Sequence, residues 1–142
     1  MKEVQHLVRL LMIIAVMAGL VFTGCAGPKP KPGEVFPCAA DSKIEKTIAP
    51  EAELADFSCV VKAWEGADTL HFNVAIKNIS DQAQRYRVNI FLDNDKAVGG
   101  LIPQSTKKGL VEPGQTAAFE YPVSGMNRGP KSIVLMVKTI SE

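Results

Sequence analysis

The 142-residue chain has few of the residues on which enzymatic chemistry usually depends. It contains two histidines, His6 and His71, and His6 lies in the N-terminal segment, ahead of the apolar run at residues 10–22. A histidine-dependent catalytic triad would therefore rest on His71 alone. No Gly-x-Ser-x-Gly sequence is present to expose a nucleophilic serine on a sharp turn. These shortages argue against an enzyme.

The chain also lacks an excess of charge of one sign. Sixteen Lys and Arg residues stand against 15 Asp and Glu residues, for a formal net charge of +1. Nucleic-acid binders usually carry a strong basic excess, so this balance argues against a nucleic-acid partner. The hydrophobic content of 46% is that of a folded protein, and the length suits one ordinary domain.

Cysteine is scarce as well, because the chain has only Cys25, Cys38 and Cys59. No Cys-x-x-Cys pair occurs, and these residues together with His71 lack the paired spacing of a zinc site. An odd number of cysteines in an exported chain often means that one is used for other chemistry.

Other cofactor motifs are incomplete. The run Asp93-Asn94-Asp95 begins like a calcium-binding loop, but the fifth and sixth positions, Ala97 and Val98, have no ligand oxygen and no glycine. The pair Gly99-Gly100 is too short for a phosphate cradle and indicates a bend or bulge. We therefore expect no metal ion and no cofactor.

A long apolar run is confined to the N-terminus. Residues 10–22 are all apolar or glycine, and as a helix they would span about 20 Å, too short for a hydrocarbon core about 30 Å thick. This is the length of a signal-peptide core. The other interpretation, a buried core helix, does not suit a run that is apolar on all faces and lies so near the start of the chain. An uncleaved signal anchor stays open, because the uncharged stretch continues to Gly27, about 18 residues in all.

The apolar run ends at Phe22-Thr23-Gly24-Cys25. This sequence resembles the lipobox of bacterial lipoproteins, in which an apolar residue and two small residues precede a cysteine, although Phe22 replaces the usual leucine. The resemblance implies that the Cys25 thiol receives a diacylglycerol and that the chain is cut between Gly24 and Cys25. The new amine is then acylated with a fatty acid such as palmitate. Three acyl chains at about 0.8 kcal/mol per buried methylene would hold the protein permanently on a bilayer.

The same resemblance implies a location and a division of the chain. It implies a membrane-anchored lipoprotein of the bacterial cell envelope that faces the periplasm, with the lipid bilayer as a partner through acylated Cys25. Ala26 follows the cysteine where an aspartate would favour the inner membrane, so we expect the outer membrane. The expected parts are a signal peptide at 1–24, the lipidated cysteine and a proline-rich linker at 25–37, and a β-sandwich domain at 38–142.

The linker alternates proline with lysine between Gly27 and Gly33. Proline favours the extended polyproline II conformation, about 3.1 Å per residue, so this segment is expected to act as a spacer. A recognition motif for a proline-binding partner is the alternative. Lys29 and Lys31 are also placed to contact anionic lipid headgroups.

With Cys25 assigned to the lipid, Cys38 and Cys59 remain. In an oxidising envelope we expect them to form a disulfide that ties an irregular segment, 38–58, to the first strand. Closing a loop of about 20 residues would stabilise the fold by roughly 3 kcal/mol. A redox or metal-binding pair is the alternative.

From residue 58 onwards the hydrophobic period is two. In residues 70–77, for example, Leu70, Phe72 and Val74 alternate with polar residues, as in a half-buried antiparallel strand. Turn residues separate such segments at 78–81, 93–95 and 112–115. The expected strands are 58–64, 70–77, 85–93, 96–101, 116–123 and 132–140, and a short helix is expected at 50–55. Short strands at this spacing predict an all-β antiparallel sandwich.

The alternation also places single side chains. His71 is expected to face solvent in mid-strand, and Trp64 is expected in the core, with an exposed ligand platform as the alternative. The last strand is apolar on both faces, so it should be central in its sheet. A solvated sheet face or a basic patch would explain four cationic residues, namely Arg85, Arg87, Lys107 and Lys108.

Four stretches carry a second resemblance, FNVAIKNIS (72–80), VNIFLD (88–93), KAVG (96–99) and LVEPGQ (110–115). They resemble the immunoglobulin-like domain of bacterial envelope lipoproteins, the FxLYD family and related domains of unknown function, over residues 68–140. Phe91-Leu92-Asp93 lacks the usual tyrosine before the aspartate, and Gln115 replaces a glutamate. The motifs mostly encode turns and strands, so the resemblance implies an immunoglobulin-like sandwich and says little about activity.

Together these features predict a non-enzymatic, membrane-anchored periplasmic lipoprotein that binds another envelope protein or assists envelope assembly. An exposed sheet face or edge strand would make the contact. The alternative is an envelope lipoprotein that senses a small ligand or a metal through Trp64 and His71.

Overall fold

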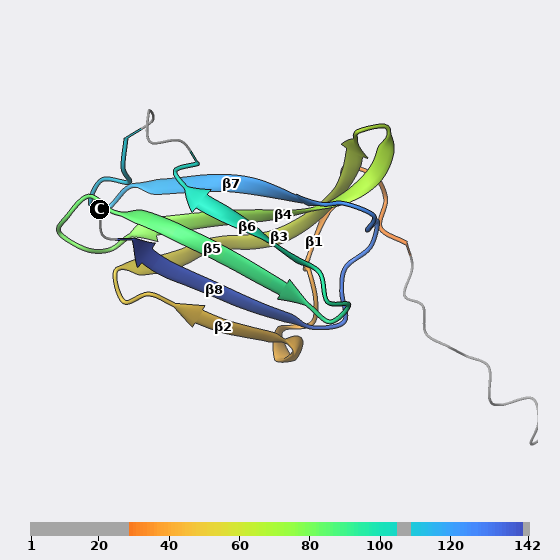
Figure 1. The fold of residues 1–142 in the computed structure, drawn as a ribbon, viewed down its shortest axis with the longest axis horizontal. Coiled ribbons are helices and arrows are strands. Elements are labelled where there is room, and N and C mark those ends of the chain that lie inside the picture. Colours follow the sequence, from red (N-terminus) through yellow and green to blue (C-terminus); the bar gives the residue numbers. More distant parts are fainter. Residues whose placement is uncertain (1–28, 105–108, 141–142) are drawn as a thin grey trace, which may run out of the picture.

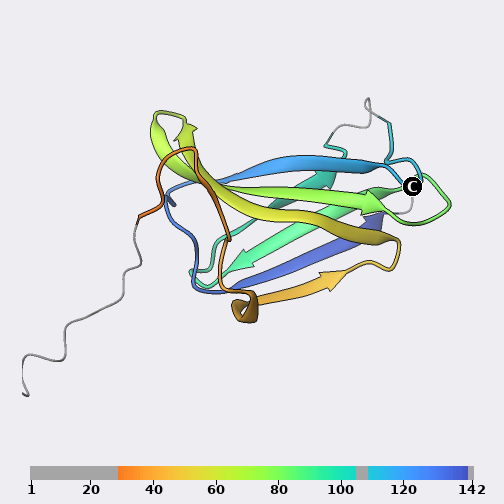
Figure 2. The same ribbon diagram turned by 180° about the vertical axis from the view of Figure 1, so that it is seen from behind.

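The computed structural model describes residues 29–104 and 109–140. They form two four-stranded sheets that pack face to face (Figures 1 and 2). One sheet has the order β1-β3-β4-β7, with β1 at Val35–Phe36, β3 at Ala52–Trp64, β4 at Ala67–Asn78 and β7 at Thr116–Val123. The other has the order β2-β8-β5-β6, with β2 at Ile44–Ile48, β8 at Ile133–Ile140, β5 at Arg85–Leu92 and β6 at Ala97–Ile102. The predicted all-β sandwich is confirmed. The expected signal peptide, the lipobox and Cys25 lie outside the described residues.

The core is built by the predicted alternation. On β4, Leu70, Phe72, Val74 and Ile76 are buried between the sheets, and β5 and β8 contribute their own alternate residues. Each large apolar side chain that is removed from water contributes about 1.5–3 kcal/mol. Strand β8 lies between β2 and β5, so the prediction of a central last strand is confirmed.

The longest pairing is the hairpin of β3 and β4, whose register runs from Ala52↔Asn78 to Trp64↔Ala67. Its two-residue turn has positive φ at Glu65 (50°) and Gly66 (83°), the conformation that matches the twist of a hairpin. A register shift between Leu54 and Asp56 places a bulge near the start of β3.

Residues 38–58 are more regular than the sequence indicated. They contain a short 3-10 helix, η1 (Asp41–Lys43), strand β2 and the first half of β3. The helix expected at 50–55 is wrong: β3 begins at Ala52, because pairing with β4 outweighs the local preference. Strand β2 pairs in parallel with β8. Its three middle residues are exposed, so its sequence lacks the alternation that reveals a strand.

Two predicted turns are confirmed by their hydrogen bonds. The buried side chain of Asn78 donates to the carbonyl oxygens of Gln82 (2.7 Å) and Val111 (2.8 Å), and its Oδ1 accepts from the Ser80 backbone N–H (2.9 Å). Later in the chain, the N–H of Gln115 donates to the carbonyl of Glu112 (3.0 Å) across Gly114, whose φ is 76°. These turns fix the ends of the strands on either side of them.

Candidate binding surfaces

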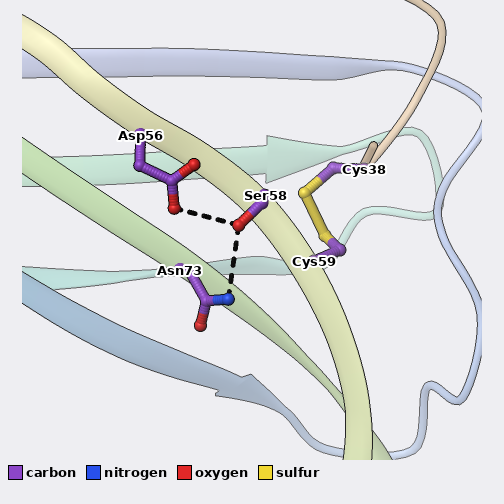
Figure 3. Close-up of a disulfide and its surroundings, with 5 residues drawn as sticks. All are labelled: Cys38, Asp56, Ser58, Cys59 and Asn73. Carbon is purple, nitrogen blue, oxygen red and sulfur yellow. Dashed lines mark hydrogen bonds between the residues drawn. A yellow bond between two sulfur atoms is a disulfide. The ribbon is translucent and has the colours of Figure 1, made fainter. Parts of the chain in front are cut away.

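Cys38 and Cys59 form the predicted disulfide (Figure 3). Both residues are almost fully buried, and the bond connects the segment after β1 to the middle of β3. On the exposed side of β3, Ser58 Oγ donates to Asp56 (2.9 Å) and accepts from Asn73 Nδ2 (3.3 Å) (Figure 3). Because the sulfur-bearing residues are shielded from solvent, the bond suits a structural staple better than a redox pair.

His71 is not the solvent-facing residue that the sequence predicted, because only 2% of its surface is exposed. On its face of the sheet, the cross-strand neighbours are Val60 on β3 and Pro122 on β7. The indole of Trp64 meets the imidazole edge to face, with ring centroids 5.7 Å apart. The period-two alternation predicted correctly that His71 lies on the face of β4 opposite to Leu70 and Phe72. Alternation does not show, however, which side chains of other strands cover that face.

The hydrogen bond of His71 fixes which ring nitrogen is free. Nδ1 lies 3.0 Å from the backbone carbonyl oxygen of Thr69. A carbonyl oxygen only accepts, so in the neutral ring Nδ1 carries the proton and Nε2 presents a lone pair. In this neutral form His71 offers a hydrogen-bond acceptor at Nε2 and also packs against Trp64.

The prediction that Trp64 lies in the core is wrong. Its side chain is 45% exposed at the end of β3, and it covers His71. The exposed ligand platform, the alternative that the sequence left open, agrees better with this position.

A half-open pocket of about 530 Å³, which we call the Trp64 pocket, lies beside the Trp64–His71 pair. Strand β6 contributes Val98 and Gly99 to its wall, and β7 contributes its central residues. The full lining is Trp64, His71, Val98, Gly99, Gln104, Phe119, Glu120, Tyr121 and Pro122. Its volume lies in the range of ordinary ligand sites.

Tyr121 is the unusual member of this lining. Its Oη is the one buried side-chain polar atom without a hydrogen-bond partner in the described part of the chain. The residue is only 3% exposed, and burial raises the pKa of its hydroxyl above the ordinary value of 10.0. Its ring meets Phe119 edge to face at 4.8 Å. A buried hydroxyl without a partner is costly, which makes it a candidate for a ligand contact.

The second candidate surface is the open edge of β6. The N–H of Leu92 donates to the carbonyl of Lys96 (2.9 Å), which identifies the hydrogen-bonded positions of the β5–β6 ladder. Since these alternate along an antiparallel pair, Val98, Gly100 and Ile102 bond to β5. The other residues of β6, which are Ala97, Gly99 and Leu101, direct their N–H and C=O groups to the edge of the sheet.

The other edges of the sandwich are protected against pairing. Strand β1 has two residues, and β2 carries Glu45 and Lys46. Strand β7 carries Glu120, and Pro122 has no N–H to offer. Short strands, charges and proline are the usual means of blunting an edge. Strand β6, with the sequence AVGGLI, has none of them.

Gly99 is required for the path of β6. Its φ is 156°, and a Cβ at this position would lie 2.1 Å from the carbonyl oxygen of Val88. The register with β5 continues unbroken through Gly99 and Gly100, so of the predicted bend or bulge the bulge is excluded. The glycines leave the middle of the β6 edge without side chains.

Other residues that the sequence singled out do not gather into a site. Arg85 is buried, and its guanidinium donates to the carbonyls of Pro103 (3.3 Å) and Gln104 (3.4 Å), which removes it from any exposed basic patch. Lys107 and Lys108 lie outside the described residues. Asp93 Oδ1 accepts from the N–H of Lys131 (3.0 Å) as part of the strand connection.

Within residues 29–104 and 109–140, no group of three or more His, Cys, Asp or Glu side chains is placed to hold a metal ion. The same residues include no helix long and apolar enough to cross a bilayer. No family model, curated protein or solved structure matches the chain.

Proposed function

We propose that this protein is a membrane-tethered, non-enzymatic binding module of the bacterial cell envelope. Its β6 edge pairs with an extended, uncharged segment of another envelope protein. The observation that carries the proposal is the edge of β6. Among the described residues no strand pairs with this edge, and β6 lacks the shortness, charge or proline of the other terminal strands β1, β2 and β7. In edge-strand addition, main-chain hydrogen bonds supply affinity and neighbouring pockets supply specificity.

The chemistry of the edge defines the segment it would accept. The strand has no charged residue, so a charged residue facing it would gain no counter-ion. Two glycines at its centre allow a second backbone to approach closely. The partner segment is therefore extended, uncharged and free of proline at the residues that bond to β6.

The tether follows from the N-terminal sequence. The lipobox resemblance at Cys25 supports acylation, and the proline-rich linker supports a spacer between bilayer and domain. The N–H of Gly33 donates to the carbonyl of Val61 (2.7 Å), which fastens the end of the linker to β3. A module held in this way meets its partner at a raised local concentration.

A second candidate function is small-ligand sensing. The Trp64 pocket, with its unpartnered Tyr121 hydroxyl and buried His71, is the observation that favours it. In that case a ligand would change the fluorescence of the only tryptophan in the chain without any protein partner.

Photo-crosslinking in living cells tests the protein-binding proposal. A photoreactive amino acid replaces Ala97 on the β6 edge in one strain and Ala118 on the β7 edge in the other. Both alanines are exposed and both lie on edge strands, so they form a matched pair. We expect a discrete crosslinked product from position 97 and none from position 118. Equal products from both positions, or none from either, would refute docking at β6.

A further inference from the structure

The Trp64 pocket and the β6 edge are adjacent, because Val98 and Gly99 belong to both. Figures 1 and 2 show β6 and β7 on the same side of the sandwich. A strand paired with β6 would run along the mouth of the pocket. We infer that the pocket receives one uncharged aromatic side chain with a hydroxyl group, a tyrosine, from the docked segment. This inference rests on the proposed function and names the chemistry of its partner.

Strand geometry brings a side chain to the pocket. Side chains of a docked strand alternate between the two faces of the sheet, so every second one points toward β7. On β6 the corresponding inward positions include Gly100, where a Cβ would lie 3.3 Å from the ring of Tyr121. Because β6 presents no side chain at Gly100, Val98 is its one side chain in the pocket wall, and a side chain entering from the neighbouring strand can pass beside it.

The polar groups of the pocket match a phenol. Tyr121 Oη has no partner, and in the neutral imidazole of His71 the Nε2 atom presents a lone pair, because Nδ1 bonds to the Thr69 carbonyl. A hydroxyl group both donates and accepts, so it can satisfy Tyr121 Oη, the buried group without a partner, which an aliphatic side chain cannot. Trp64, Phe119 and Pro122 supply apolar and aromatic surface for the ring.

The same lining disfavours a charged side chain. Glu120 is the one ionisable lining residue other than His71 and Tyr121, and its carboxylate is paired with Lys62 at 2.6 Å. A cation or an anion entering the pocket would therefore lose its hydration without gaining an unpaired counter-ion. Aromatic residues in such pockets commonly dominate the binding energy of an interface.

Four synthetic peptides test the inference on the mature, lipidated protein in detergent. Each peptide has nine residues of alternating Thr and Val with blocked ends, and the central residue is Tyr, Phe, Ala or Lys. Affinity is measured by titration, and pairing with β6 by slowed hydrogen exchange of the Ala97, Gly99 and Leu101 amides. We expect the Tyr peptide to bind about tenfold more tightly than the Ala peptide, with Phe between them and Lys weakest.

Two matched variants locate the contact. Tyr121→Phe should remove the difference between the Tyr and Phe peptides and leave the affinity for the Ala peptide unchanged. Tyr86→Phe removes a hydroxyl that bonds to the Glu51 carbonyl (3.0 Å) outside the pocket, and it should leave all four affinities in their original order.

The outcomes separate the two proposals. If all four peptides slow exchange on β6 equally and bind equally, the pocket is not an anchor site, while docking at β6 stands. If the Tyr preference survives in Tyr121→Phe, the hydroxyl contact is wrong. If no peptide binds and none slows exchange, docking of an extended strand at β6 fails together with the anchor pocket. Binding of the Lys peptide more tightly than the Tyr peptide would contradict the assigned chemistry.

Discussion

The ammonium group of Lys62 and a carboxylate oxygen of Glu120 lie 2.6 Å apart and bridge strands β3 and β7 across β4. Lys62 faces Thr69 and Glu120 faces Asn73, the positions two before and two after His71 on the same face of β4. The ion pair therefore spans His71, and together with Trp64 it explains why this histidine is buried. It also neutralises the one carboxylate that lines the Trp64 pocket.

Breaking this ion pair should cost little stability. Both side chains are more than a third exposed, so solvent screens their attraction, and such pairs usually contribute between 0 and about 1 kcal/mol. We expect Glu120→Gln to lower the free energy of unfolding by less than about 1 kcal/mol in urea titrations. A loss above about 2 kcal/mol would contradict the expectation that solvent screens this ion pair.

The hydroxyls of the two tyrosines should contribute differently to stability. Tyr86 Oη donates to the carbonyl of Glu51, so we expect Tyr86→Phe to cost about 1 kcal/mol. Tyr121 Oη has no partner, so Tyr121→Phe should be neutral or stabilising. Urea unfolding of the two variants side by side provides the comparison, and the opposite order would show that Tyr121 has a partner in solution.

Tyr121 should also make the fold sensitive to alkaline pH. Burial raises the pKa of its hydroxyl in the folded state above the unfolded value of 10.0. Below about pH 10 both states keep the proton, and the fold has its full stability. As the pH rises above this value, only the unfolded chain loses the proton, so stability falls by up to about 1.4 kcal/mol per pH unit. Unfolding measured at about pH 9 and about pH 11 should show a smaller fall in Tyr121→Phe than in the wild-type protein.

Removing the disulfide should lower stability substantially. The bond joins residues 21 positions apart, and closing a loop of this size restricts the unfolded chain by roughly 3 kcal/mol. We expect a double variant, Cys38→Ala with Cys59→Ala, to lose about this amount in urea titrations. The wild-type protein treated with reductant should approach the same value. Equal stability of oxidised and reduced wild-type protein would show that the bond does not stabilise the fold.

The proposed lipid tether makes a separate prediction. Cys25→Ser removes the thiol that the lipobox resemblance assigns to the diacylglycerol. We expect the variant to keep its signal sequence and to lack the mass of the fatty acids. A variant that matures and partitions like the wild-type protein would exclude acylation at Cys25.

The sequence predicted those strands and turns that can be recognised from their own residues, by apolar–polar alternation or by turn-forming residues. The alternation of Leu70, Phe72 and Val74 marked β4, and the Pro113-Gly114 pair marked a turn. Strand β2 escaped detection because only its first and last residues turn toward the core, with charged residues between them. Its place is set by pairing with β8, nearly ninety positions later in the chain.

The candidate site could not be predicted in the same way. Trp64, Val98 and Tyr121 come from three strands far apart in the sequence, and only the stacking of the two sheets brings them together. The burial of His71 depends on side chains of β3 and β7, which alternation within β4 does not reveal. The one available signal was the absence of charge and proline in AVGGLI, compared with the other edge strands.

Blocking the β6 edge while leaving the fold intact tests the central claim most directly. A photoreactive residue at Leu101 reports docking in living cells, and a lysine is added to the β6 edge by Ala97→Lys or to the β7 edge by Ala118→Lys. A charge on an edge strand prevents pairing with another strand. We predict that Ala97→Lys abolishes the crosslinked product and that Ala118→Lys leaves it unchanged. Equal crosslinking in both variants, with both proteins folded, would contradict the account.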